Sequence, residues 1–156
     1  MKTIERTIPA PPETVWTLWT TAGGISRWWA PDGFRTDVDR IDPTPGGELV
    51  YTMTAEDPAQ VAFLQQNGLP LATQARKVFT ELDPPHRVAY RSLIDFVPDH
   101  APYEQLTTVD LEPTEGGTRV VMQVEELHDD VWTERLLAGR ANELDNLARL
   151  VAASED

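Results

Sequence analysis

Residues 130–151 read DVWTERLLAGRANELDNLARLV and carry the pattern of a long amphipathic helix. The apolar residues of that pattern are Leu137, Ala141, Leu144, Ala148 and Val151. Their spacing of four, three, four and three residues places them on one helical face. Because such a face must be buried against another layer, the rest of the chain has to supply a surface for it.

That surface is predicted to be a curved antiparallel sheet. Stretches in which apolar and polar residues alternate with the period of a strand precede the helix. They span residues 2–8, 34–38, 49–53, 76–82, 88–96, 103–111 and 118–125. Proline and glycine turns separate them, so we expect each strand to pair with the next in a sheet of about six to seven strands. The predicted fold class is therefore α+β.

Short helices are expected at two places between the strands. After the first strand, one helix begins at Pro12 and a second contains Ile25, Trp28 and Trp29, with Gly23-Gly24 between them. A further helix is predicted over residues 57–67, capped by an aspartate, followed by a glycine stop and placed where it could act as a lid. No linker or repeat divides the chain, so residues 1–156 are predicted to form a single domain.

Composition and charge narrow the possible partners. The formal charge of −13 repels phosphate backbones and anionic headgroups, so neither nucleic acid nor a membrane is expected as a partner. The chain has no cysteine and its first residues predict no signal peptide, which is typical of a cytoplasmic protein. Monomer and homodimer remain equally open.

Several motifs resemble one known superfamily. They are Pro11-Pro12 with Val15-Trp16, Trp28-Trp29 with Pro31, Gly46-Gly47, Glu81-Leu82 with Pro84-Pro85 and Arg87-Val88, and Gly116-Gly117-Thr118. The set resembles the START-like (SRPBCC) ligand-binding superfamily, whose helix-grip fold is that of the birch pollen allergen. Within it, the chain is similar over residues 4–151 to the activator of heat-shock protein ATPase homologues, in their bacterial single-domain form. The resemblance implies a sheet wrapped around a long C-terminal helix, with a cavity between them.

The predicted cavity is lined by large apolar side chains, chosen by strand phase and by nearness to the inserted helix. These predicted ligand-binding residues are Trp29, Met53, Phe63, Phe79, Tyr90, Phe96, Tyr103 and Met122. Trp16 and Trp19 are assigned instead to the core of the first short helix. A small hydrophobic or amphipathic molecule is the expected occupant.

Candidate catalytic groups gather in one stretch, where Asp95, His100 and Tyr103 supply an acid, a base and a phenol. A surface ion pair between Arg91 and Asp95 is the favoured explanation of part of that stretch. No metal site is expected, because the histidines lack ligand spacing and His128 is interpreted as part of a helix cap. The glycine pairs lack the phosphate-binding and dinucleotide fingerprints, so no cofactor is expected.

Three hypotheses about function follow. The first, which the sequence favours, is a binding module without catalysis. The second is a cyclase or hydrolase that uses the same cavity, with Asp95, His100 and Tyr103 in its active site. The third is a chaperone-linked protein-interaction module, which would have a filled interior and an exposed apolar patch.

Overall fold

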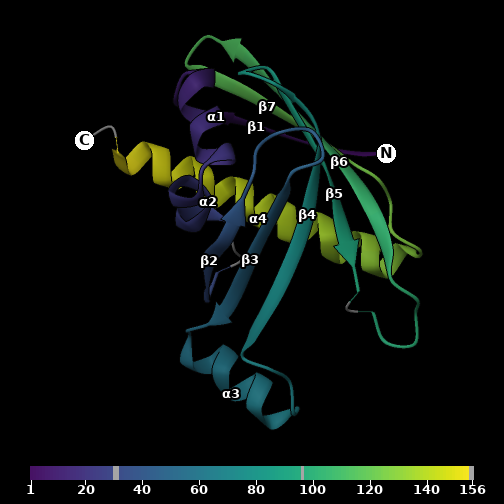
Figure 1. Ribbon diagram of the computed structural model, residues 1–156. Coiled ribbons are helices and arrows are strands. Elements are labelled where there is room, and N and C mark those ends of the chain that lie inside the picture. The colour runs from purple at the N-terminus through teal and green to yellow at the C-terminus, as the bar shows by residue number, and fades with distance from the viewer. Residues whose placement is uncertain (30–31, 96, 155–156) are drawn as a thin grey trace.

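The computed structural model describes residues 1–29, 32–95 and 97–154, and Figure 1 shows their arrangement. A strongly curved sheet wraps around one long helix, as in the helix-grip fold that the sequence predicts. In chain order the elements are β1 (Lys2–Ile8), α1 (Pro12–Thr20), α2 (Ala22–Trp28), β2 (Phe34–Ile41), β3 (Glu48–Ala55), α3 (Pro58–Gln66), β4 (Ala72–Asp83), β5 (Arg87–Ile94), β6 (Tyr103–Thr114), β7 (Gly117–Val124) and α4 (Asp130–Ser154).

The described residues form one antiparallel sheet of seven strands, in the order β1-β7-β6-β5-β4-β3-β2. From β2 to β7 each strand pairs with its neighbours in sequence, as predicted, and β1 closes the far edge against β7. Two register shifts interrupt the ladders, one in β2 between Val38 and Arg40 and one in β4 between Phe79 and Glu81. Such bulges increase the local twist of a strand, which suits a sheet that has to curve.

The core lies between the concave face of the sheet and α4. Leu144 of α4 is fully buried and Val151 nearly so, as predicted, and Leu147 is buried beside them. The other predicted residues of that face are only partly buried: Leu137, Ala141 and Ala148. The backbone of α4 runs close to β1 and to α2. Figure 1 shows the helix crossing the hollow of the sheet.

The helices α1 and α2 close one side of this core with aromatic side chains. Trp19, Trp28 and Trp29 pack against one another at ring-centroid distances of 4.8 to 6.1 Å, mostly edge to face. The indole of Trp28 donates a hydrogen bond to the carbonyl of Leu18 at 2.8 Å. Trp19 is buried, as predicted, whereas Trp16 is only partly buried and packs against the edge of the core.

The inserted helix α3 lies apart from this core. Asp57 caps it by accepting from the backbone N–H groups of Ala59 and Gln60, and Gly68 follows with a φ of 66°, as the sequence predicts. Figure 1 shows α3 beyond the ends of β3 and β4, away from α4. None of its residues is buried, so in this arrangement it does not cover the concave face.

No helix within residues 1–29, 32–95 and 97–154 is both long enough and apolar enough to cross a lipid bilayer.

Candidate functional site

A row of polar side chains crosses the concave face of the sheet. Lys77 of β4 is the register partner of Ser92 of β5, and Ser92 is the partner of Gln105 of β6. All three residues are almost completely buried, and the Nζ of Lys77 donates to the Oγ of Ser92 at 2.7 Å. Where the sequence predicts an apolar lining, the structure places an amine, a hydroxyl and an amide side by side.

Aromatic rings enclose the amine of Lys77. Its Nζ lies 5.5 Å from the ring centre of Trp29, 5.9 Å from that of Tyr51 and 5.3 Å from that of Tyr90. A protonated amine at these distances would make cation–π contacts. Trp29 follows α2. Its backbone N–H donates to the carbonyl of Ile25, and its backbone carbonyl accepts a hydrogen bond from the hydroxyl of Thr36. The cage is thus assembled from α2, β3 and β5 around a residue of β4.

The helix α4 adds a buried ion pair on the opposite side. Nη1 of Arg140 lies 3.1 Å from both carboxylate oxygens of Glu143, one helical turn away. Their side chains are only 12% and 7% exposed. Burying a pair of charges is costly unless geometry and further hydrogen bonds compensate, so charged residues on this face need an explanation beyond packing.

These surroundings act on the titratable groups of the interior. Burial lowers the pKa of the Lys77 amine well below its ordinary value, and the positive charge of Arg140 acts in the same direction, while Glu143 opposes it. Burial raises the pKa of Tyr51 to about 12, and it raises the pKa of Tyr90 as well. Both phenols therefore stay protonated near neutral pH and can donate hydrogen bonds.

Four buried polar atoms around the amine lack a hydrogen-bond partner among the described residues. They are Nε1 of Trp19, Nε1 of Trp29, Oη of Tyr90 and Nε of Arg140. The indole nitrogens of Trp29 and Trp19 lie close to the hydroxyls of Tyr51 and Tyr90, but neither contact has the geometry of a hydrogen bond. Each of the four groups can donate a hydrogen bond, so the described interior contains several donors without an acceptor.

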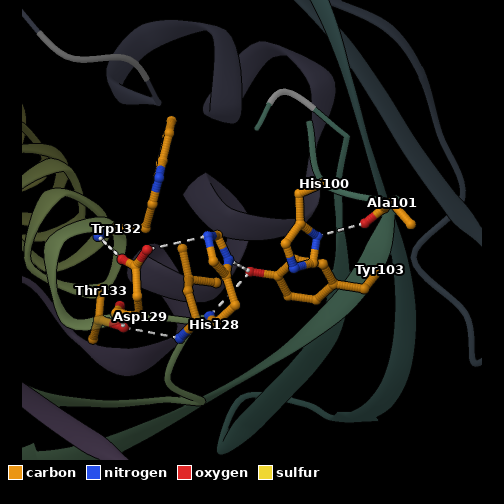
Figure 2. Close-up of polar contacts among 8 residues, drawn as sticks. His100, Ala101, Tyr103, His128, Asp129, Trp132 and Thr133 are labelled. Carbon is orange, nitrogen blue, oxygen red and sulfur yellow. Dashed lines mark hydrogen bonds and ion pairs between the residues drawn. The ribbon is translucent and has the colours of Figure 1, made fainter. Parts of the chain in front are cut away.

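A second polar cluster lies at the end of the sheet, near the start of α4. Figure 2 shows the hydroxyl of Tyr103 sharing a hydrogen bond of 2.7 Å with Nδ1 of His128, whose backbone N–H donates to the same hydroxyl at 3.3 Å. The ring centroid of His100 lies 4.3 Å from that of His128 and 5.2 Å from that of Tyr103. The carboxylate of Asp129 accepts a hydrogen bond from the backbone N–H of Trp132 at 2.8 Å, so the predicted helix cap is present.

This cluster gathers two of the three predicted catalytic residues. His100 and Tyr103 meet, and His128 joins them from far along the chain, which no local spacing in the sequence could indicate. Asp95 and Arg91 are both exposed, and the described residues contain no ion pair between them. A phenol hydrogen-bonded to an imidazole can exchange a proton. Acid–base chemistry at this end of the sheet would therefore involve Tyr103 and His128.

The predicted ligand-binding residues lie in four different settings. Trp29, Phe79, Tyr90 and Met122 are buried in the core. Met53 and Tyr103 are partly buried, the former against the core and the latter in the second cluster. Phe63 is 57% exposed on α3. Phe96 lies outside the described residues.

Sequence reasoning missed the polar residues of the interior, although two signals were present. Lys77 precedes Phe79 by two residues and so shares its face of the strand. Leu136, Arg140, Glu143 and Leu147 are spaced four, three and four residues apart, which places two charges on the inner stripe of the helix. Within the described part of the chain, no group of three or more histidine, aspartate or glutamate side chains is arranged to hold a metal ion.

Two hollows open on the surface formed by the described residues. One, of about 290 Å³, lies between α2, β2 and α4, and Arg27, Trp28, Trp29, Phe34, Arg35 and Glu56 are among its lining residues. The other, of about 280 Å³, lies between α1, α2 and the end of α4. Neither lies between the centre of the sheet and α4. Trp29 nonetheless belongs both to the first hollow and to the cage around Lys77.

Comparison with known proteins gives a consistent result. The model of the family described as Activator of Hsp90 ATPase homolog 1-like protein matches residues 9–152. No curated protein matches the chain.

Solved structures match along almost the whole chain. A protein from Chromobacterium violaceum is 23% identical, with a TM-score of 0.75 and coverage of 96% of this chain and 95% of that one. The AHSA1 protein from Silicibacter pomeroyi is 21% identical, with a TM-score of 0.76 and 98% coverage of both chains. An AHSA1-like protein from Aeromonas hydrophila is 24% identical, with a TM-score of 0.71 and coverage of 99% and 93%. These similarities show the fold.

Proposed function

The chain belongs to the family of Activator of Hsp90 ATPase homolog 1-like proteins, and on that premise we propose that it binds a small amphipathic molecule between the concave face of the sheet and α4. The family supplies the fold, and a shared fold does not fix a function. The proposal therefore has to be supported by the chemistry of this interior.

The main support for this binding function comes from buried hydrogen-bond donors that lack an acceptor in the described part of the chain. The indoles of Trp19 and Trp29, the hydroxyl of Tyr90 and Nε of Arg140 are all buried without a hydrogen-bond partner among the described residues. A buried polar group left unsatisfied costs about 1–3 kcal/mol. A ligand that brings acceptor oxygens among these donors would recover part of that cost. An apolar ligand without acceptors would leave it in place.

The residues around the donors define the body of such a ligand. Phe79 and Met122 are buried on the same concave side, and Trp29 and Tyr90 present their rings at a centroid distance of 5.8 Å. Rings and short acyl chains pack well against such surfaces. The expected ligand therefore combines an apolar ring or chain with an acceptor group such as a carboxylate, carbonyl or hydroxyl.

Trp29 is the expected gate. It belongs to the hollow beside α2 and also to the cage around Lys77, so it stands between solvent and the interior. In the structure the interior is closely packed around it, with Trp29 only 1% exposed. Binding thus requires the ring of Trp29 to move. The association rate constant of the ligand is therefore expected to lie below the diffusion limit.

A thermal-shift screen combined with native mass spectrometry tests the proposal. The panel consists of fatty acids, flavonoids and polyketide-type phenols. A ligand present at about 100 times its Kd should stabilise the protein by about 2.7 kcal/mol. The variant Tyr90→Phe removes one of the unpartnered donors and should reduce that stabilisation.

Tyr103→Phe is the matched control, because the hydroxyl of Tyr103 is already bonded to His128. It should leave the ligand-induced shift unchanged. A panel that stabilises neither the wild type nor the variants would count against binding in the interior, as would equal losses in both variants.

Self-association is a second candidate function, supported by a different observation. Residues 58–75 carry no charged side chain, although the chain as a whole has a formal charge of −13. Phe63 and Leu69, in and just after α3, are 57% and 48% exposed. This is a part of the surface that two copies of an acidic chain can approach with little repulsion. Sedimentation of the wild type should then show a dimer that Phe63→Glu dissociates, and a wild-type monomer at high concentration would contradict the idea.

A further inference from the structure

The interior of the sheet holds one of only two lysines in the chain. The sequence contains Lys2 and Lys77 against eleven arginines. Lys2 is exposed in β1, with 52% of its side chain accessible, whereas Lys77 is 3% exposed. An arginine cannot lose its proton in a protein, but a lysine can, and the neutral amine is a nucleophile. The chain thus has a lysine amine buried in its interior, where lysine side chains are seldom found.

Three geometric features suit this amine to nucleophilic chemistry. The hydroxyl of Ser92 fixes its position at 2.7 Å. The rings of Trp29, Tyr51 and Tyr90 shield it from water. Arg140 brings a second positive charge to the same interior, which disfavours protonation of the amine, while its partner Glu143 acts in the opposite direction. Desolvation and a neighbouring cation are the two conditions that activate lysine nucleophiles.

We propose that Lys77 forms a reversible imine with an aldehyde or ketone group of a ligand bound between the sheet and α4. This inference rests on the proposed binding function and adds the chemical class of the ligand, a carbonyl compound with an apolar body. The reaction is a condensation that needs no oxidant, reductant or further reactant.

The lone pair of Nζ attacks the carbonyl carbon, the carbon–oxygen π electrons move to the oxygen, and proton transfer from nitrogen to oxygen gives a neutral carbinolamine. The hydroxyl then leaves as water after protonation, while the nitrogen lone pair forms the C=N bond and the remaining N–H proton is released. The hydroxyl of Ser92, within hydrogen-bond distance of Nζ, can relay these protons.

Borohydride trapping tests the proposal on the intact protein. The protein is incubated at pH 7 with 2-naphthaldehyde and then with borohydride, which reduces an imine to a stable secondary amine, and the adduct is located by peptide mapping. Lys2 and the N-terminal amine serve as internal standards in the same sample. We expect modification of Lys77 to exceed that of Lys2 severalfold, because the lowered pKa of Lys77 leaves more of its amine neutral at pH 7.

The variants Lys77→Arg and Lys77→Met should lose this adduct, while Lys2→Arg should keep it. If either Lys77 variant fails to fold, the comparison of Lys77 with Lys2 in the wild type still decides the outcome. Equal labelling of the two lysines, or labelling of Lys2 alone, would overturn the proposal.

A matched probe separates this proposal from the binding function. The alcohol 2-naphthalenemethanol has the same body and cannot form an imine. If both probes stabilise the protein but no adduct forms at Lys77, the imine is wrong and binding stands. If neither probe binds or labels the protein, the imine proposal falls, and the thermal-shift panel decides the fate of the binding function.

Discussion

The amine of Lys77 lies 2.7 Å from the hydroxyl of Ser92, its register partner on the neighbouring strand, and both side chains are almost completely buried. This contact gives the amine a fixed place at the centre of the concave face. It also makes the stability of the protein sensitive to changes at either residue, because a buried amine without a partner is costly.

Replacing Ser92 with alanine should lower the free energy of unfolding by about 1–3 kcal/mol, because Lys77 loses its hydrogen-bond partner. Urea unfolding measures the change. Ser26→Ala, at an exposed position of α2, is the matched control and should stay within about 0.5 kcal/mol of the wild type. Similar effects of the two substitutions would show that the Lys77–Ser92 contact contributes little.

The stability difference between the wild type and Lys77→Met should depend on pH. Below the ordinary lysine pKa of 10.5, the unfolded chain binds a proton at Lys77 that the folded chain, with its lowered pKa, binds less. The free energy of unfolding of the wild type should therefore rise with pH relative to that of Lys77→Met. Over pH 7 to 9 Arg140 stays charged and Tyr51 and Tyr90 stay neutral, so they do not produce this difference.

Urea unfolding of both proteins at pH 7, 8 and 9 measures that difference. The advantage of the methionine variant should be largest at pH 7 and should shrink toward pH 9. A difference that stays constant across this range would mean that the amine is protonated in the folded state.

Two tyrosine-to-phenylalanine substitutions should have different effects on the protein without ligand. Tyr103→Phe removes the hydrogen bond to His128 and should cost about 0.5–1.5 kcal/mol of stability. Tyr90→Phe removes a buried hydroxyl that has no partner among the described residues and should be neutral or stabilising. Thermal unfolding compares them, and a large loss in Tyr90→Phe would reveal a contact of that hydroxyl that the structure does not show.

Breaking the buried ion pair between Arg140 and Glu143 should lower the free energy of unfolding more than breaking an exposed pair. Glu143→Gln leaves Arg140 with an uncompensated buried charge and should cost about 3–5 kcal/mol, whereas the double replacement Arg140→Met with Glu143→Leu should recover most of that loss. Asp145, also on α4, forms an exposed pair with Arg6 of β1, and Asp145→Asn should cost less than about 1 kcal/mol. Chemical denaturation measures all three variants, and equal losses from Glu143→Gln and Asp145→Asn would contradict the buried role.

Much of the fold could be predicted from local patterns. The period of Leu144 and Val151 indicates the buried face of α4, and alternation along residues 2–8 or 118–125 indicates strands. Glycine and proline turns then leave neighbour-to-neighbour pairing as the simplest topology, which the sheet has. These features depend on residues close in sequence, so they can be read from the chain itself.

The site could be predicted only in part, because it depends on how distant elements meet. Aromatic residues such as Trp29 and Tyr90 were expected in the interior from strand phase and composition. A charged residue is usually exposed, so strand and helix periodicity alone do not place Lys77 or Arg140 in the interior. The curvature of the sheet brings both into one core. The contact of Tyr103 with His128 likewise arises from the placement of α4, which no local pattern encodes.

The indole N–H signals of the five tryptophans provide a direct test of binding between the sheet and α4. A ¹⁵N-labelled sample is titrated with decanoate and with 2-naphthalenemethanol, which carry acceptor oxygens but form no imine. Binding in the interior should shift the signals of Trp19 and Trp29, whose N–H groups lack partners, and leave that of Trp132, at the start of α4, in place. If both probes bind while the Trp19 and Trp29 signals stay unchanged, the ligand site lies elsewhere and the interior is only a packed core.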